Sequence, residues 1–361
     1  MTAASSSPWT DAVADNGAVR FVDTVLRGAG QVMFQDNPLT GLLFLAGITW
    51  GAIDAGMAEV AVAAVVGLVV ATVTAILLDV DRQGLRQGMY GFNGILVGVG
   101  AATFLHVDGH VWAYIVVGAA VSTVVMLALA NVLKTWGVPA LTFPFVLTTW
   151  FLVLGAWAFA NVEPAGLGPA RLPVAPGVGA ADVDLTVSFV AETLFRNVSQ
   201  VFLINNVATG VIFVVALAVS SRWSAVFAVA GSALALATAL VVGAEGTSIT
   251  SGLFGFSAVL TAIALGSVFY TPGGRVAAFA ALGVVFTVVV QGALDAALSP
   301  VGIPTFTAPF VVATWLFLLP KERFVPVHHA PIAGGALAPS PSAGPGSDAS
   351  PDAAAHQEVP A

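Results

Sequence analysis

One short motif occurs twice in this sequence, as "VPALTFPF" at 138–145 and as "IPTFTAPF" at 303–310. Each copy has a proline, a threonine three residues later and then a Pro-Phe pair, set among apolar residues. Two further pairs of segments match in the same order and with nearly the same spacing: "RGAGQVMFQDNPLTG" (27–41) with "RNVSQVFLINNVATG" (196–210), and "YGFNGILVG" (90–98) with "FGFSAVLTA" (254–262). Three matches with nearly one spacing indicate an internal duplication, so the two halves of the chain should fold alike.

The composition is typical of a membrane protein. Hydrophobic residues make up 58% of the chain and charged residues only 8%, against about 25% in soluble domains. Apolar runs of roughly 18–25 residues, the length that crosses a bilayer, recur along most of the sequence. We place ten spans, in order, near 38–56, 58–80, 90–105, 110–133, 138–162, 206–220, 223–243, 253–269, 275–298 and 304–320.

The number of spans determines how the two halves are related. Each half would cross the membrane five times, and an odd number of crossings turns the second half upside down relative to the first. The sequence therefore predicts an all-α integral membrane protein: ten transmembrane helices in two inverted five-helix repeats, with broken or re-entrant half-helices around a central pore.

The distribution of basic residues gives the orientation. With both termini in the cytoplasm, nine of the eleven Lys and Arg residues lie on the cytoplasmic side, as the positive-inside rule requires. We expect a multi-pass protein of the cell membrane (plasma or inner membrane), with both termini cytoplasmic.

Polar and Pro/Gly/Ala-rich segments set the domain boundaries. The C-terminal segment has no periodic apolar face to bury, so we expect it to be disordered. The segments are a polar N-terminal tail (1–19), a first membrane repeat (20–162), an extracellular or periplasmic linker loop (163–185), a second, inverted repeat (186–322) and a disordered C-terminal tail (323–361).

The duplicated motif has features of a transport site. Pro139 and Pro304 each remove a backbone donor, so a helix cannot run through them unbroken. Broken helices at matching places in two inverted halves are a sequence indication of a binding site near the bilayer midplane. The pseudo-two-fold axis would bring Thr142 and Thr307 together there. A lone threonine in a membrane helix more often bonds to its own helix, but its duplication between prolines favours the site.

The ionisable residues exclude several functions. Few lie deep in the expected spans, and of these Asp295 has no obvious partner, whereas an ion path or proton relay would normally place charged groups there. The sequence has no cysteine, and its five histidines lie in a short loop and the C-terminal tail: His106, His110, His328, His329 and His356. Neither an ATP-binding loop nor a nucleophile–base pair is recognisable. We expect a small, neutral, polar solute, no metal, cofactor or nucleic acid, and no enzymatic activity.

Paired aromatic and amide residues suggest how a solute would be selected. Phe92 and Phe256 begin the repeated "GF" segments, and Leu96 and Leu260 follow one helical turn later on the same face. Flat rings can form a slot that admits planar solutes, although a single phenylalanine in a span is more often a packing residue. Gln31 and Gln200, one in each half, would supply amide groups at the two mouths: this is a hypothesis from position alone.

At these residues the sequence resembles the urea transporter family. The family's Leu-Pro-x-x-Thr-x-Pro-Phe signature is similar to both copies of the motif, with Val138 and Ile303 in place of leucine. The segments "GQVMFQDNPLTG", "MYGFNGILVG" and "SQVFLINNVATG" look like its other hallmarks. The resemblance covers about residues 20–322. It implies a passive channel for urea, assembled as a homotrimer with one continuous pore in each protomer.

The resemblance also implies roles for ten residues. In family members, oxygen atoms line one side of the filter as a ladder, while phenylalanine and aliphatic side chains press on the faces of urea. Carried over to this sequence, the ladder consists of Gln31, Thr142, Thr307 and Gln200, and the slot walls consist of Phe34, Phe92, Leu96, Val201, Phe256 and Leu260. Leu203 departs from the pattern because it repeats the position of Phe34, so we expect that side of the slot to be wider or less selective.

Two rival functions remain open from the sequence. An ion-coupled secondary transporter of a small neutral solute could use the same inverted-repeat plan. An aquaporin-like channel would carry two Asn-Pro-Ala motifs, to which only Asn37-Pro38-Leu39 comes close. Water and other small planar amides are further candidate permeants.

Overall fold

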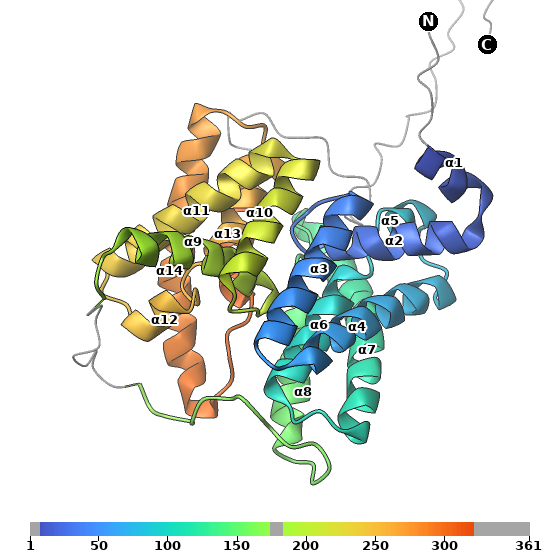
Figure 1. The fold of residues 1–361 in the computed structure, drawn as a ribbon, viewed down its shortest axis with the longest axis horizontal. Helices are drawn as coiled ribbons and strands as arrows, with labels where there is room; N and C mark the ends of the chain where they lie inside the picture. The colour runs from blue at the N-terminus through green and yellow to red at the C-terminus, as the bar shows by residue number, and fades with distance from the viewer. Residues whose placement is uncertain (1–7, 174–182, 321–361) are drawn as a thin grey trace, which may run out of the picture.

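The computed structural model describes residues 8–173 and 183–320 (Figure 1). The predicted disordered tail, 323–361, lies outside these residues, as do 1–7 and 174–182. Within the predicted polar N-terminal tail, the structure has one short helix, α1 (Pro8–Asp15), and the beginning of the next, α2 (Gly17–Gln31).

The described residues are mainly helical; the segments between helices are turns and loops, and they include an isolated β-bridge between Leu105 and Pro164. After α2, the first half contains α3 (Pro38–Asp54), α4 (Ala58–Leu77), α5 (Arg82–Arg86), α6 (Phe92–Phe104), α7 (Gly109–Leu133), η1 (Lys134–Trp136) and α8 (Phe143–Ala156). The second half contains α9 (Val187–Ser199), η2 (Gln200–Phe202), α10 (Val207–Ser220), α11 (Arg222–Val241), α12 (Gly246–Thr250), α13 (Phe256–Ile263), η3 (Ala264–Val268), α14 (Gly274–Leu298), η4 (Ser299–Val301) and α15 (Ala308–Leu318).

Several of these helices are long and apolar enough to cross a membrane. Four pass by length and hydropathy: Ala58–Leu77, Gly109–Trp136, Arg222–Val241 and Gly274–Val301. A fifth candidate is the pair Val187–Phe202 and Val207–Ser220, which is bent by 76° at its break. The described part of the chain is therefore an all-helical membrane protein with four or five candidate spans.

The other predicted spans contain shorter apolar helices. These are Pro38–Asp54, Phe92–Phe104, Phe143–Ala156, Phe256–Val268 and Ala308–Leu318, each between 10 and 17 residues long. The predicted spans at 138 and 304 begin too early, because the helices start only at Phe143 and Ala308. The apolar residues before them form non-helical loops, as the prolines in the motif require.

Equivalent asparagines begin α3 and α10. The Oδ1 atom of Asn37 accepts a hydrogen bond from the backbone N–H of Leu39 at 2.9 Å, and Oδ1 of Asn206 accepts from that of Thr209 at 2.9 Å. Each asparagine thus satisfies one of the N–H groups that the first turn of a helix leaves unpaired. The equivalent helix in each half therefore has the same asparagine N-cap, which explains why the asparagine recurs at the same place in the two matching segments.

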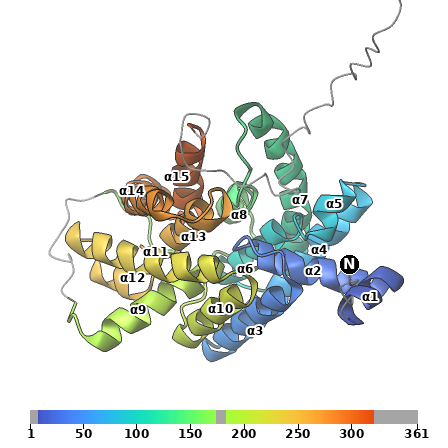
Figure 2. The same ribbon diagram turned by 90° about the horizontal axis from the view of Figure 1, so that it is seen from above.

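The two halves lie side by side, with α3 and α10 in contact between them (Figures 1 and 2). The hydroxyl of Thr40 on α3 donates to the carbonyl of Ala216, and the hydroxyl of Thr209 on α10 donates to that of Gly47, at 2.9 and 2.8 Å. Both threonines are fully buried. The same residue type from each half thus joins it to the other half.

Within the first half, α4 and α6 approach closely because small residues face one another. A Cβ atom added at Gly94 would lie 2.3 Å from the Cβ of Ala71 and 2.4 Å from the carbonyl oxygen of Gly67. A Cβ added at Gly98 would lie 2.0 Å from the carbonyl oxygen of Ala63. Small residues that let helix backbones meet are a common basis of helix association in membranes. This contact supports α6, whose first residue is the candidate Phe92.

We predict that Gly94→Ala destabilises the protein by about 1–3 kcal/mol, because the added methyl group overpacks the α4–α6 contact. The matched control is Gly292→Ala, in the interior of α14, where an added Cβ would meet no atom within 4 Å. In the control, alanine should leave stability unchanged or raise it, because alanine favours a helix more than glycine does. Thermal unfolding of both purified variants checks this, and equal melting temperatures would contradict the close contact.

Candidate functional site

The two threonines of the duplicated motif meet directly. Oγ1 of Thr142 and Oγ1 of Thr307 lie 2.7 Å apart, within hydrogen-bond distance, although 165 residues separate them in sequence. Thr142 immediately precedes α8 and Thr307 immediately precedes α15, and their exposed fractions are 3% and 1%. The structure thus brings the two copies of the motif together through their hydroxyl groups.

The residue before each threonine has an unusual backbone conformation. Leu141 has a φ of 53° and Phe306 a φ of 48°, in the left-handed region that residues with a side chain rarely adopt. This conformation costs on the order of 1–3 kcal/mol and persists where surrounding packing holds it. Both side chains are buried. The turn that delivers each threonine is therefore held by the fold, and it occurs twice.

Two tryptophans hold the loops reciprocally. The indole Nε1–H of Trp150, on α8, donates to the carbonyl oxygen of Pro304 at 2.9 Å. The indole Nε1–H of Trp315, on α15, donates to the carbonyl oxygen of Pro139 at 2.8 Å. Each broken segment thus finds a donor on the helix that follows the other one. Sequence reasoning missed both tryptophans, although they repeat with the same spacing as the two threonines.

Asn93 secures the start of α8. Its Oδ1 atom accepts from the backbone N–H of Phe145 at 3.0 Å, a first-turn group that has no partner inside the helix. Asn93 is fully buried and was also missed, although it directly follows Phe92 in the repeated "GF" segment. The equivalent residue in the second half is Ser257, whose hydroxyl has no partner among the described residues.

A polar cluster supports the second loop only. Nε2 of Gln291, on α14, donates to Oγ1 of Thr305 at 2.8 Å and to Oδ1 of Asp295 at 2.9 Å. Asp295 has no obvious partner from the sequence alone, and in the structure its carboxylate accepts a hydrogen bond from Gln291. The repeat gives no sign of this cluster, because Met126 and Ala140 occupy the positions equivalent to Gln291 and Thr305.

The two candidate glutamines make matching contacts. Nε2 of Gln31 donates to the backbone carbonyl of Gln87 at 2.8 Å, and Nε2 of Gln200 donates to that of Ser251 at 2.9 Å. Their exposed fractions are 8% and 7%. No donor among the described residues bonds to the side-chain oxygen of either glutamine. Each amide is therefore fixed by its nitrogen and keeps its oxygen available as an acceptor.

The candidate wall residues fall into two groups. Phe92 and Phe256 are the first residues of α6 and α13, and they are 7% and 3% exposed. Leu96 and Leu260, one turn later, are completely buried. Among the described residues, neither phenylalanine makes a contact with another aromatic ring, so their ring faces meet no other ring.

Phe34 lies on the turn after α2. Its ring packs edge-on near Phe269 and Phe310, with centroid separations of 5.9 and 6.1 Å. Its φ is 62°, and that of Leu203 is 57°, so the two residues occupy the same strained position in the two halves. Val201, two residues before Leu203, is buried in η2.

Among the hydrogen bonds and ring contacts of the described residues, only the threonine pair joins two of the ten candidates directly. All ten side chains are uncharged at every physiological pH, because glutamine, threonine and the apolar residues do not titrate in that range. Within residues 8–173 and 183–320, no three His, Asp or Glu side chains gather as a metal site. The candidate residues comprise hydroxyl and amide oxygen atoms and apolar side chains, a set of groups that suits a neutral polar solute.

Comparison with known proteins agrees with these features. A sequence model described as "UT: Urea transporter" matches residues 22–322, a range that includes both halves and all ten candidate residues. Urea transporter 1 of Ovis aries is 31% identical over 322 residues, covering 87% of this chain and 81% of the relative. Urea transporter 1 of Rattus norvegicus is 30% identical over 321 residues, covering 87% and 80%. The extent of these matches confirms the resemblance found in the sequence: the chain belongs to the urea transporter family.

Proposed function

We propose that this protein conducts urea across the membrane, down its concentration gradient, by a channel mechanism. The family is one of transporters and not of enzymes. The observation that carries the proposal is the 2.7 Å contact between Thr142 and Thr307, which joins two loops interrupting apolar helices. Two hydroxyls at such a point can each donate and accept, as a solute with one carbonyl and four N–H groups requires.

The proposed architecture is a pair of inverted five-helix repeats, with ten crossings and broken half-helices around the pore. The matching spacings support it, because the tryptophan donors, the strained residues before the threonines and the capping asparagines all occur once in each half. The repeats would comprise 20–162 and 186–322, joined by the linker 163–185. We place the protein in the plasma or inner membrane. The distribution of basic residues supports an orientation with both termini in the cytoplasm.

The ten candidate residues would form the selectivity filter. Urea that left water without gaining new hydrogen bonds would lose several kcal/mol. In the filter, the side-chain oxygen atoms of four residues would replace the water molecules one after another: Gln31, Thr142, Thr307 and Gln200. One of the two threonine hydroxyls donates a hydrogen bond to the other. A passing urea would exchange that bond for bonds to itself. Because the filter has no charge, binding would stay weak enough for release.

We also propose a homotrimer in which every protomer has its own pore. Large apolar side chains on the outer surface support a partner or lipid there: Trp50, Ile53, Phe151 and Trp157 are each between 58% and 64% exposed. Large apolar side chains exposed in this way are typical of surfaces that meet membrane lipid or another protein. The pore of each protomer would be independent, so trimerisation would stabilise the channel and not complete it.

Stopped-flow urea efflux from proteoliposomes tests the function. We expect efflux to follow the urea gradient, with the same rate whether or not a proton or sodium gradient is present. An ion-gradient requirement would replace the channel with the coupled transporter. Failure of a well-assembled protein to pass urea at all would overturn the proposal.

Replacing Thr142 and Thr307 with valine tests the centre of the filter. Valine keeps the shape but removes both hydroxyls, which leaves urea amides unpaired at a cost of about 1–3 kcal/mol, or roughly a 5- to 150-fold loss of flux. The matched control is Thr149→Val with Thr314→Val, on the same two helices, whose buried hydroxyls have no described partner. The control should conduct normally. Normal flux in a folded Thr142→Val/Thr307→Val protein would remove these residues from the filter.

Selectivity tests the walls. Phe92→Ala and Phe256→Ala each open volume beside the pore that neighbouring helices close only in part. We expect the permeability of glycerol relative to urea to rise about tenfold, the scale on which hydrophobic pockets discriminate. Phe213→Ala is the control, because that ring packs against Phe44 and Phe202 and makes no ring contact with Phe92 or Phe256 among the described residues. It should lower stability without changing the ratio; unchanged ratios in both filter variants would make Phe92 and Phe256 ordinary packing residues.

Leu203→Phe tests the departure from the family pattern. Phe34 already occupies this backbone conformation at a φ of 62°, so a phenylalanine should fit at Leu203 with its φ of 57°. We expect the added ring to narrow that side of the slot and to reduce passage of methylated ureas or thiourea before that of urea. Relative permeabilities in proteoliposomes give the answer, and an equal effect on all solutes would contradict a slot wall at this position.

A further inference from the structure

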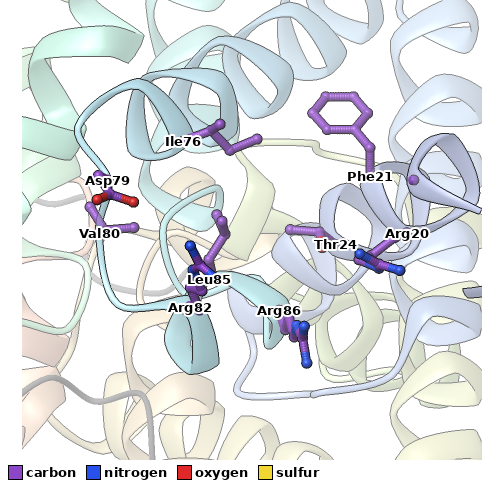
Figure 3. A pocket seen from close by; sticks show the side chains of 10 residues that line it. Arg20, Phe21, Thr24, Ile76, Asp79, Val80, Arg82, Leu85 and Arg86 are labelled. Atoms are coloured by element: carbon purple, nitrogen blue, oxygen red, sulfur yellow. The ribbon is translucent and has the colours of Figure 1, made fainter. Parts of the chain in front are cut away.

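A basic pocket lies away from the candidate filter, between α2, the end of α4 and α5 (Figure 3). Its volume is about 390 Å³, within the roughly 300–1,000 Å³ of ligand pockets. None of the ten candidate filter residues lines it. The lining residues are Gly17, Arg20, Phe21, Thr24, Ile76, Asp79, Val80, Arg82, Leu85 and Arg86.

Three guanidinium groups and one carboxylate give this pocket a net positive charge. Arg82 and Arg86, on α5, are exposed and make no hydrogen bond or ion pair with the described residues. Arg20 is held in place, because its Nε donates to the carbonyl of Val13 at 3.1 Å and another of its nitrogens to that of Ala14. Planar guanidinium groups that are weakly hydrated and unpaired are the usual recognition element for phosphate oxygens.

The other part of the pocket is apolar. Phe21 and Ile76 lie at one end of the view in Figure 3, and Arg82 and Arg86 lie at the other. Ile76 is the penultimate residue of α4, one of the helices long enough to span a membrane. The pocket therefore lies where a spanning helix ends, and its lining combines apolar side chains with cationic groups. This arrangement fits an amphiphile with an anionic head.

The repeat relationship makes the pocket specific to one face of the membrane. When the two halves are aligned on their "GF" segments, Arg82 and Arg86 correspond to Gly246 and Thr250, and Asp79 corresponds to Gly243. The second half therefore has no equivalent basic cluster at α12. In an inverted pair, the positive pocket would occur at the cytoplasmic side only, the leaflet where anionic lipids attract basic residues.

We propose that this pocket binds the phosphate headgroup of an anionic phospholipid, with Arg82 and Arg86 contacting the headgroup and Phe21 and Ile76 contacting its acyl chains. The apolar end argues for a lipid over a free phosphate ion, because an ion would use only the arginines. A bound lipid would link α2 to α5. Gln31 is the last residue of α2, and its side chain donates to the carbonyl of Gln87, which directly follows α5. The proposal does not depend on which solute passes the pore.

Native mass spectrometry of the full-length protein in neutral detergent tests the proposal. The protein is offered phosphatidylglycerol and phosphatidylcholine in competition, and the lipid retained per protomer is counted. We expect wild-type protein to prefer phosphatidylglycerol. The Arg82→Gln/Arg86→Gln variant should lose about 30-fold in that preference, because each basic residue near an anionic surface contributes nearly a factor of six.

Matched variants separate charge from position. Arg222→Gln with Arg275→Gln removes the same charge from exposed arginines elsewhere, and this variant should retain the wild-type preference. Arg82→Lys/Arg86→Lys keeps the charge without the guanidinium fork and should give an intermediate preference. Size-exclusion profiles matching that of wild type confirm that the variants are folded.

Two outcomes would overturn the proposal. Equal preference in wild type and in Arg82→Gln/Arg86→Gln would remove the pocket as the binding site. In a separate measurement, inorganic phosphate is added without lipid, and its protection of the protein against thermal unfolding is compared with that given by phosphatidylglycerol. If phosphate alone protected the wild type as well as phosphatidylglycerol does, the pocket would bind a free anion and not a lipid.

Discussion

The pairing of backbone polar groups in an apolar environment is the constraint on which the rest of this structure depends. A helix satisfies its own backbone, but the loops before α8 and α15 do not, and unpaired groups there would cost several kcal/mol each. Side chains from distant parts of the chain supply the missing bonds: the indoles of Trp150 and Trp315, and the amide oxygen of Asn93. The contact between the two threonines is possible because these bonds hold both loops in place. The geometry at the two threonines thus depends on side chains that pair the backbone where two apolar helices are interrupted.

Local signals made part of this site predictable from the sequence. Prolines act on their own neighbours, so Pro139 and Pro304 indicate broken helices without knowledge of the fold. Duplication adds long-range information, because one motif repeated in two similar halves predicts that Thr142 and Thr307 meet. The structure agrees, with 2.7 Å between their hydroxyl oxygens. The family resemblance rested on the same residues, and it extends over the range that the comparison matches.

Other features could not be predicted because they depend on tertiary contacts. A tryptophan in an apolar helix is equally suited to packing or to a membrane interface, so Trp150 gives no sign that it donates to Pro304. Gln291 has no counterpart in the first half, and its bond to Thr305 needs α14 beside the second loop. Hydropathy likewise does not distinguish an apolar helix from an apolar loop. The predicted span at 138 therefore began before the helix, which starts at Phe143.

The two halves are similar but not identical, and this difference has a kinetic consequence. Phe34 and Leu203 occupy the same left-handed position, yet only one of them is aromatic, and the cluster of Gln291 supports only the second loop. In a passive pore, unequal halves cannot favour one direction of net flow, because at equal concentrations the two unidirectional fluxes must balance. They do allow unequal occupancy. In the proposed filter, urea entering from the side of Phe34 and urea entering from the side of Leu203 would reach half-saturation at different concentrations. The equilibrium would be symmetric, but the saturation of the two unidirectional fluxes would not be.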